Sequence, residues 1–124
     1  MLAGNRLVAF VPVSNLDAAR RFYRDTLGLA LTSEDSVALA FEVEGVMLRA
    51  TLVPALTLQP FTVLGWEVVN ASTTTKELVK AGVVMERFSG MDQDADGLWR
   101  SRGGALVGWF KDRDGIMLSM TDFS

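Results

Sequence analysis

The stretch ALVGWFKDRDGIMLSMTDFS, residues 105–124, decides the fold of this chain. Residues 107–110 and residues 116–121 are rich in β-branched, aromatic and other apolar side chains, and each segment predicts a β-strand. Residues 112–115 between them read Asp-Arg-Asp-Gly, the composition of a tight turn in which Gly115 can adopt a positive φ. The stretch therefore predicts a β-hairpin.

A sequence similar to that of this turn occurs seventy positions earlier. Glu-Gly-Val-Met-Leu at residues 44–48 matches Asp-Gly-Ile-Met-Leu at residues 114–118, which indicates a duplicated module. The first module is predicted as a strand, a helix and three strands. The helix begins at Ser14 or Asn15 and ends at Gly28, because these residue types cap helix ends. The predicted strands of this module are residues 7–13, 29–33, 37–43 and 46–53.

The second module repeats the order. It is predicted as a strand at residues 61–69, a helix from residues 70–72 to Gly82, a strand at residues 83–88 and then the final hairpin. Leu78 and Val79 are expected to face the core from this helix. The two turns are further apart than the two helix-ending glycines, so residues 89–104 are predicted to be an inserted loop.

Length and composition limit the classes of protein. With 124 residues, the chain is expected to be one domain, made of modules 5–53 and 61–122 and a linker at 54–60. The net charge of −3 disfavours nucleic-acid binding. Cysteine and histidine are both absent, which removes disulfides, thiolate sites, the commonest metal ligand and the commonest general base. No apolar run is long enough to span a bilayer, and the N-terminus is interpreted as a strand, so no membrane association and a cytoplasmic location are expected.

Three motifs follow one another along the chain. The first motif is Asn15-Leu16-Asp17, followed by Arg-Phe-Tyr-Arg-Asp-Thr-Leu-Gly at residues 21–28. The second is Glu67-Val68, followed by Leu78 and by Lys-Ala-Gly-Val at residues 80–83. The third is Trp-Phe-Lys-Asp-Arg-Asp-Gly at residues 109–115. In this order they resemble the vicinal oxygen chelate superfamily, also called the glyoxalase/bleomycin resistance protein/dioxygenase superfamily. The resemblance implies an α+β fold in which two βαβββ modules form a cupped mixed sheet. Arg113 stands where the family often has proline, and Ile116 where it often has asparagine.

The resemblance also implies a cavity between the modules, in which family enzymes hold a divalent metal on four strand positions. These positions correspond to Val8, Arg49, Val63 and Ser119. Valine has no donor atom, the positive charge of arginine opposes a cation, and serine alone is a poor ligand. We therefore expect no metal and no other cofactor at these positions.

Strand alternation groups further side chains with these four. The resulting candidate ligand-binding residues are Val8, Phe10, Met47, Arg49, Val63, Glu67, Met117 and Ser119. A mixed, largely apolar set of this kind suits a small organic ligand with one charged end. The alternative is that the side chains only fill a small barrel, with Arg49 and Glu67 as a structural ion pair.

Three further features of the sequence are candidates for parts of a site. Trp99 is a further ligand-binding candidate, either as a lid over the cavity or as a residue that packs its loop onto the body, whereas Trp66 is expected to face the helix layer. Residues 92–97, Asp-Gln-Asp-Ala-Asp-Gly, match the start of a calcium loop. The bidentate glutamate that such a loop needs is replaced by Gly103, so a solvated acidic turn is expected. A Ser119 nucleophile would have no histidine to activate it.

Three functional hypotheses follow. The first is a metal-free protein that binds a small, partly apolar ligand, similar to the bleomycin-resistance type. The second is a metal-independent lyase or isomerase, with Glu67 as general base and Arg49 stabilising an enolate or carboxylate. The third is a metal-dependent lyase or dioxygenase that uses carboxylates. The resemblance further implies a homodimer, and the linker is long enough to let two chains exchange modules.

Overall fold

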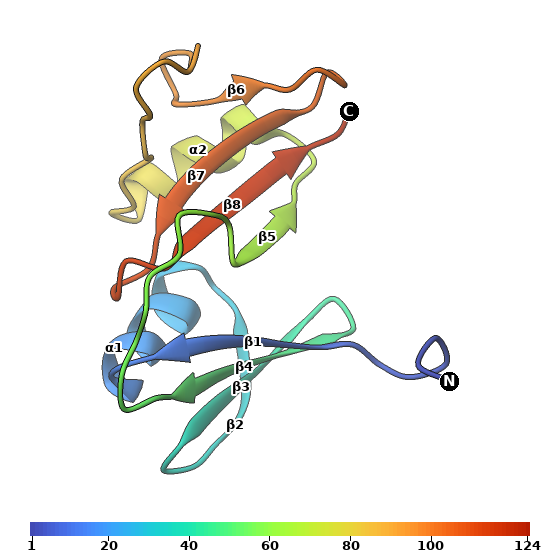
Figure 1. The fold of residues 1–124 in the computed structure, drawn as a ribbon, viewed down its shortest axis with the longest axis vertical. Coiled ribbons are helices and arrows are strands. Elements are labelled where there is room, and N and C mark those ends of the chain that lie inside the picture. Colours follow the sequence, from blue (N-terminus) through green and yellow to red (C-terminus); the bar gives the residue numbers. More distant parts are fainter. The chain divides into compact units, whose positions relative to one another are not determined.

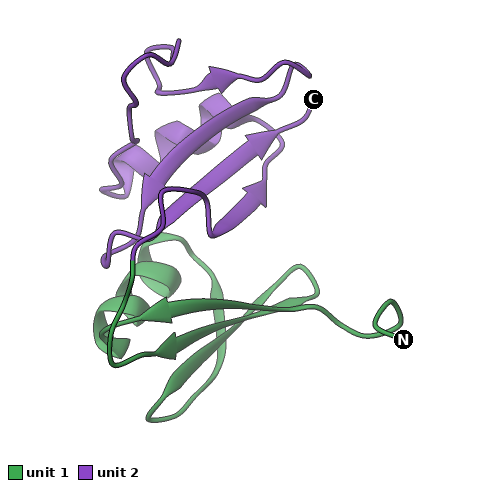
Figure 2. Ribbon diagram, in the orientation of Figure 1, with its two compact units in different colours: residues 1–57 green, residues 58–124 purple.

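The computed structural model describes all 124 residues, and the chain divides into two compact units, residues 1–57 and 58–124 (Figure 2). Each unit contains one four-stranded mixed sheet with a helical segment on one face (Figure 1). This is the α+β architecture that the sequence predicts. None of the helices has the length and apolar character that crossing a bilayer requires.

Unit 1 follows the predicted βαβββ order. Its elements are β1 (Val8–Val13), α1 (Leu16–Arg20), η1 (Arg21–Thr26), β2 (Ala30–Glu34), β3 (Ala38–Val43) and β4 (Val46–Leu52). The strand order in the sheet is β1-β4-β3-β2. β1 runs parallel to β4, while the β3–β4 and β2–β3 pairs are antiparallel.

The helical segment of unit 1 begins as predicted and then departs from an α-helix. The Asn15 side chain caps the start, because its Oδ1 accepts a hydrogen bond from the Ala18 N–H at 2.9 Å. After Arg20 the segment widens into the π-helix η1, in which the Leu27 N–H donates to the Phe22 carbonyl. Phe22 and Tyr23 of η1 are both buried.

Unit 2 has the same strand order as unit 1. Its elements are β5 (Leu64–Glu67), α2 (Ala71–Lys80), β6 (Trp99–Arg100), β7 (Leu106–Lys111) and β8 (Met117–Asp122). The strand order is β5-β8-β7-β6, with β5 parallel to β8 and the other pairs antiparallel. Equal topology in the two units is what a duplicated module requires, and it supports the duplication inferred from the two turns.

The predicted strand at residues 83–88 is wrong, and the second strand of unit 2 is β6, inside the segment predicted to be an inserted loop. Side chains provide bonds here that a strand ladder would otherwise provide. The Gln93 side chain accepts from the Phe88 N–H at 2.7 Å and donates to the Glu86 carbonyl at 3.0 Å. Arg87 donates to two carbonyls of the following turn. One main-chain bond joins the segment to the sheet, from the Glu86 N–H to the Trp109 carbonyl of β7 at 2.7 Å, and no ladder of such bonds forms.

The helix α2 packs on one face of the unit 2 sheet. The core there contains Ala71, Leu98 and Met120, with Leu78 packed against it. Leu78 faces inward as predicted, whereas the inward prediction for Val79 is wrong, since this side chain is 53% exposed. The two residues differ by one helical step of about 100°, which moves Val79 off the buried stripe.

The two turns of similar sequence, at residues 44–45 and 112–115, are tight turns with glycine at a positive φ, as expected. Gly115 has φ +88°, and the Asp112 Oδ1 accepts hydrogen bonds from the N–H groups of Asp114 and Ile116, both at 2.9 Å. In unit 1, Glu44 and Gly45 have φ values of +44° and +85°. The prediction of two tight turns is confirmed.

Candidate ligand-binding surfaces

Each sheet has a helix side and an opposite side, which we call its open face. In unit 1, Tyr23 of η1 packs against Phe41 of β3 with ring centroids 6.0 Å apart, so Phe41 marks the helix side. Paired residues point to the same side of a sheet, and neighbours along a strand alternate. The open face of unit 1 therefore carries four of the predicted ligand-binding residues, namely Val8, Phe10, Met47 and Arg49.

The open face of unit 1 combines a cation with exposed apolar groups. Val8 is paired with Met47 and Phe10 with Arg49, and the Phe10 side chain is 60% exposed. Arg49 makes no hydrogen bond and no ion pair within its unit. It contributes a small electrostatic effect to the lowered pKa of Asp35, which is caused mainly by hydrogen bonds from the N–H groups of Val37 and Ala38. Arg49 is thus held by no partner of its own in unit 1.

The open face of unit 2 carries the other predicted residues. The Val63 N–H donates to the Met117 carbonyl at 2.9 Å, Gly65 is paired with Ser119, and Glu67 is paired with Thr121. Trp66 lies on the opposite side, where it stacks on Phe110 with centroids 6.5 Å apart, as expected for the helix layer. The predicted residues on the open face are Val63, Glu67, Trp99, Met117 and Ser119.

An aromatic cluster, formed by Phe88, Trp99 and Trp109, lies on this open face. Trp109 of β7 is the direct strand partner of Ser119. Its ring is 6.2 Å from that of Trp99 and 5.5 Å from that of Phe88, and the latter pair meets edge to face. Of the two roles left open for Trp99, the structure supports packing onto the sheet, because Trp99 is part of β6 and is paired with Val107.

From the sequence, Trp109 is one of three tryptophans that could stack on a ligand, but it is not placed among the ligand-binding residues, and Phe88 is missed. Alternation along the hairpin could have placed Trp109, because Phe110 is a core residue and its neighbour must face the other way. Phe88 could not be found in this way, since its segment is not a strand.

Gly65 keeps the space beside the Ser119 hydroxyl free of a side chain. A Cβ atom at position 65 would lie 3.1 Å from the Ser119 Oγ. Ser119 makes no hydrogen bond through its hydroxyl within unit 2, although the residue is only 6% exposed. The hydroxyl next to the aromatic cluster is therefore available to a ligand.

The side chains at the four strand positions do not fit the divalent metal that the family implies. The strand registers support the equivalence of these positions in the two units. Val8 is paired with Met47, two residues before Arg49. Val63 bonds to Met117, two residues before Ser119. Two valines offer no donor atom, and the guanidinium repels a cation. No group of three or more histidine, cysteine, aspartate or glutamate side chains is arranged to hold a metal anywhere in the chain.

The acidic segment at residues 92–97 forms a turn. The Asp94 Oδ1 accepts hydrogen bonds from the N–H groups of Asp96 and Leu98, both at 2.9 Å, and Gly97 has φ +83°. The Asp94 carboxylate thus closes its own loop.

Glu67 is exposed at the end of β5. It makes no hydrogen bond or ion pair within unit 2, so no neighbouring side chain of its unit orients the carboxylate. Arg49 belongs to the other unit, and its pairing with Glu67 stays a prediction.

Comparison with known proteins agrees with this architecture. Residues 5–120 match the sequence profile of the Glyoxalase/Bleomycin resistance protein/Dioxygenase superfamily. No functionally curated protein sequence matches the chain.

Three similar solved structures cover almost the whole chain. A member of this superfamily from Sphaerobacter thermophilus DSM 20745 has a TM-score of 0.76 and 16% identity, covering 98% of this chain and 99% of its own. A glyoxalase family protein from Enterococcus faecalis has a TM-score of 0.74 and 18% identity, with the same coverage. Lactoylglutathione lyase from Agrobacterium tumefaciens has a TM-score of 0.72 and 14% identity, covering 95% of this chain and 92% of its own. The chain belongs to the Glyoxalase/Bleomycin resistance protein/Dioxygenase superfamily.

Proposed function

We propose that this protein binds a small, partly apolar organic ligand and does so without a metal at the four strand positions. The observation that carries the proposal is the aromatic cluster on the open face of unit 2, next to the Ser119 hydroxyl. Aromatic side chains give a ligand a large contact area, and a planar group can stack on them or meet them edge to face. The hydroxyl can donate one hydrogen bond to the ligand, which fixes its orientation.

The open face of unit 1 supports a related preference by itself. Arg49 lies beside the exposed Phe10 and has no partner in its unit. A guanidinium next to an aromatic ring suits a ligand that has an anionic group beside an apolar part. The proposal therefore favours aromatic carboxylates as ligands.

The side chains favour binding over turnover. A serine nucleophile needs a neighbouring base, and the chain has no histidine. Glu67 as the base of a lyase or isomerase would need to be positioned, and no side chain of unit 2 bonds to it. Binding needs only the surfaces described above.

The three tryptophans allow a sharp test, because they lie on different faces of one sheet. Each gives a separate indole N–H signal in a ¹H–¹⁵N spectrum. We would titrate the protein with phenylacetate, 1-naphthoate and bleomycin, and use cyclohexylacetate as a probe with the same charge as phenylacetate but no aromatic ring. Trp99 and Trp109 are expected to shift on binding of the aromatic probes, while Trp66 on the helix side stays in place.

Two variants complete the test. Trp109→Leu should abolish the response of Trp99, whereas Trp66→Phe should leave it unchanged. The proposal fails if no aromatic probe shifts Trp99 or Trp109, or if cyclohexylacetate shifts them as strongly as phenylacetate. Equal shifts of all three indoles would indicate a change of the whole unit and would also contradict the proposal.

A further inference from the structure

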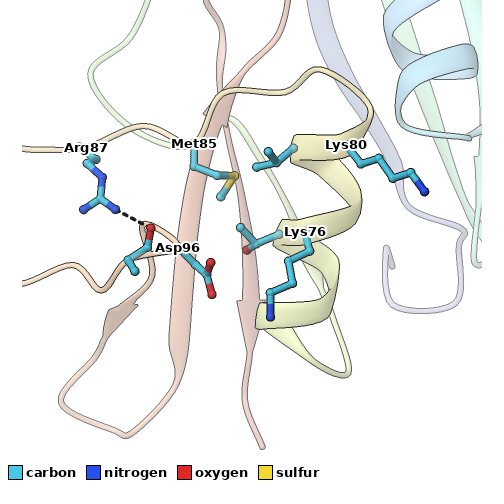
Figure 3. A pocket seen from close by; sticks show the side chains of 8 residues that line it. Lys76, Lys80, Met85, Arg87 and Asp96 are labelled. Atoms are coloured by element: carbon cyan, nitrogen blue, oxygen red, sulfur yellow. Dashed lines mark hydrogen bonds between the residues drawn. The ribbon is translucent and has the colours of Figure 1, made fainter.

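A groove lies in unit 2, on the side of the sheet that carries α2. It measures about 460 Å³ and lies between α2 and the segment that leads to β6 (Figure 3). Its volume falls in the range of about 300 to 1,000 Å³ that is common for small-molecule sites. The residues that matter for its chemistry are Thr75, Lys76, Lys80, Met85, Arg87 and Asp96.

The groove is cationic, although the chain is acidic. Three cations and one carboxylate line it, while the whole chain has a net charge of −3. Lys76 and Lys80 are four residues apart on α2, a spacing at which like charges repel. Neither lysine forms an ion pair, and Lys80 makes no hydrogen bond. The Asp96 carboxylate, which accepts from the Ser72 hydroxyl at 3.3 Å, offsets only part of the positive charge of the groove.

A buried hydroxyl without a partner also lines the groove. Thr75 is 2% exposed, and its Oγ1 has no hydrogen-bond partner. A threonine inside a helix often bonds to the carbonyl four residues earlier, but Thr75 does not. Because buried hydroxyls are normally bonded, this donor points to a missing acceptor.

The far wall of the groove is fixed in place. One guanidinium nitrogen of Arg87, Nη2, donates to the carbonyls of Asp94 and Ala95 at 2.7 and 2.9 Å. Figure 3 shows the second of these bonds as a dashed line. This leaves the other nitrogens of Arg87 available. Met85 adds an apolar surface between Arg87 and α2 (Figure 3).

From these contacts we infer that the groove binds a small organic anion, of the class of short aliphatic carboxylates. The carboxylate accepts a hydrogen bond from the Thr75 hydroxyl and is neutralised by the lysines of α2. The alkyl part lies on Met85. The Lys80 side chain extends away from Met85 in Figure 3, and since no partner holds it, it is free to turn toward a bound anion.

This site is independent of the aromatic cluster, because it lies on the opposite face of the sheet. The test uses hexanoate as the probe and hexanamide as its uncharged counterpart, observed through main-chain amide signals. Hexanoate is expected to shift the amides of residues 75–80, 85–87 and 94–96 in a saturable manner and to leave the Trp99 and Trp109 indoles in place. Hexanamide is expected to shift none of these signals.

Two sets of variants probe the charge and the hydroxyl. The double variant Lys76→Gln/Lys80→Gln should bind hexanoate at least about fivefold more weakly, as expected for the loss of two charges. Its matched control is Arg102→Gln/Arg113→Gln, which removes two exposed charges of unit 2 outside the groove and should change binding less than twofold. Thr75→Val keeps the shape of the side chain and should weaken binding about fivefold through the lost hydrogen bond.

The outcomes are distinct. Saturable shifts confined to the groove, with the losses given above, support the inference. The inference is overturned if hexanoate gives no saturable shift, if hexanamide shifts the same amides, or if the control double variant weakens binding as much as the lysine variant.

Discussion

Replacing Gly108 by alanine tests the packing between the unit 2 sheet and the residues on its helix side. Gly108 does not have a positive φ, so its main chain does not require glycine. The neighbouring side chains do require glycine at this position. A Cβ atom would lie 2.9 Å from the Leu98 Cδ2, 2.9 Å from the Met85 Cε and 3.2 Å from the Met120 Cε. Carbon atoms prefer a separation of about 3.5 to 4.0 Å, so all three groups would have to move.

The size of the effect follows from two opposing contributions. Overpacking of a core costs about 1 to 3 kcal/mol, and the atoms contacted here are the ends of flexible side chains, which favours the lower half of that range. Replacing glycine by alanine restricts the unfolded chain, which raises the free energy of unfolding by about 0.4 to 1 kcal/mol. We expect the free energy of unfolding to fall by about 1 kcal/mol, which corresponds to a decrease in Tm of about 4 to 8 °C for a unit of this size.

Urea unfolding followed by tryptophan fluorescence measures this change in unit 2, because Trp66, Trp99 and Trp109 all lie in that unit. The matched control is Gly103→Ala, where a Cβ would have no atom within 4 Å and φ is not positive. This control should unfold at the same urea concentration as the natural protein or a slightly higher one. If Gly108→Ala is as stable as Gly103→Ala, the described packing of Leu98, Met85 and Met120 against β7 is wrong.

Three further predictions follow from single side chains. Gly65→Ala places a methyl group 3.1 Å from the Ser119 Oγ, so it should weaken phenylacetate binding in the indole titration while changing the free energy of unfolding by less than about 1 kcal/mol; unchanged affinity would remove this hydroxyl from the site. Thr75→Val should raise the free energy of unfolding by about 1 kcal/mol in urea, since it replaces a buried hydroxyl that has no partner; a loss of stability would mean that the hydroxyl is bonded. The pKa of Asp122 is lowered by hydrogen bonds from the Ser124 hydroxyl and from main-chain N–H groups, so its stabilising effect is present above the ordinary pKa of 3.8 and is lost as the pH falls below that value. The difference in unfolding free energy between the natural protein and Asp122→Asn should therefore shrink as the pH is lowered from about 4 towards 2, and a difference that does not vary with pH would contradict this assignment.

Local chemistry explains why much of the fold could be predicted. Asn15 and Asn70 cap the helices as expected, and the Asn70 Oδ1 accepts from the Thr73 N–H at 3.0 Å. Gly28 and Gly82 follow the helices with φ values of +77° and +97°. These features depend on residues within one turn of each other, which is the range over which a sequence pattern can be interpreted directly. The repeated turn sequence also predicted the topology, because two copies of one module are expected to have the same order of strands.

The errors lie where distant contacts outweigh local preference. Residues 83–88 have the composition of a strand, yet Gln93 and Arg87 bond their segment to the following turn, and the short β6 takes the edge of the sheet. The π-helix η1 was also not predicted. It carries Phe22 and Tyr23 into the core, and this requirement of packing cannot be inferred from helix propensity.

By itself, the sequence determined the order of the elements, the duplication, the two glycine turns and the absence of donor atoms at two of the four family metal positions, because these depend on residue type and spacing alone. Only the tertiary structure decided which side chains come together. Phe88, Trp99 and Trp109 meet because β6 and the segment before it fold onto β7, and Thr75 lines a cationic groove because residues 85–96 pass over α2. Both arrangements depend on contacts between segments far apart in the chain, whose geometry is set by packing and is not encoded in any local pattern.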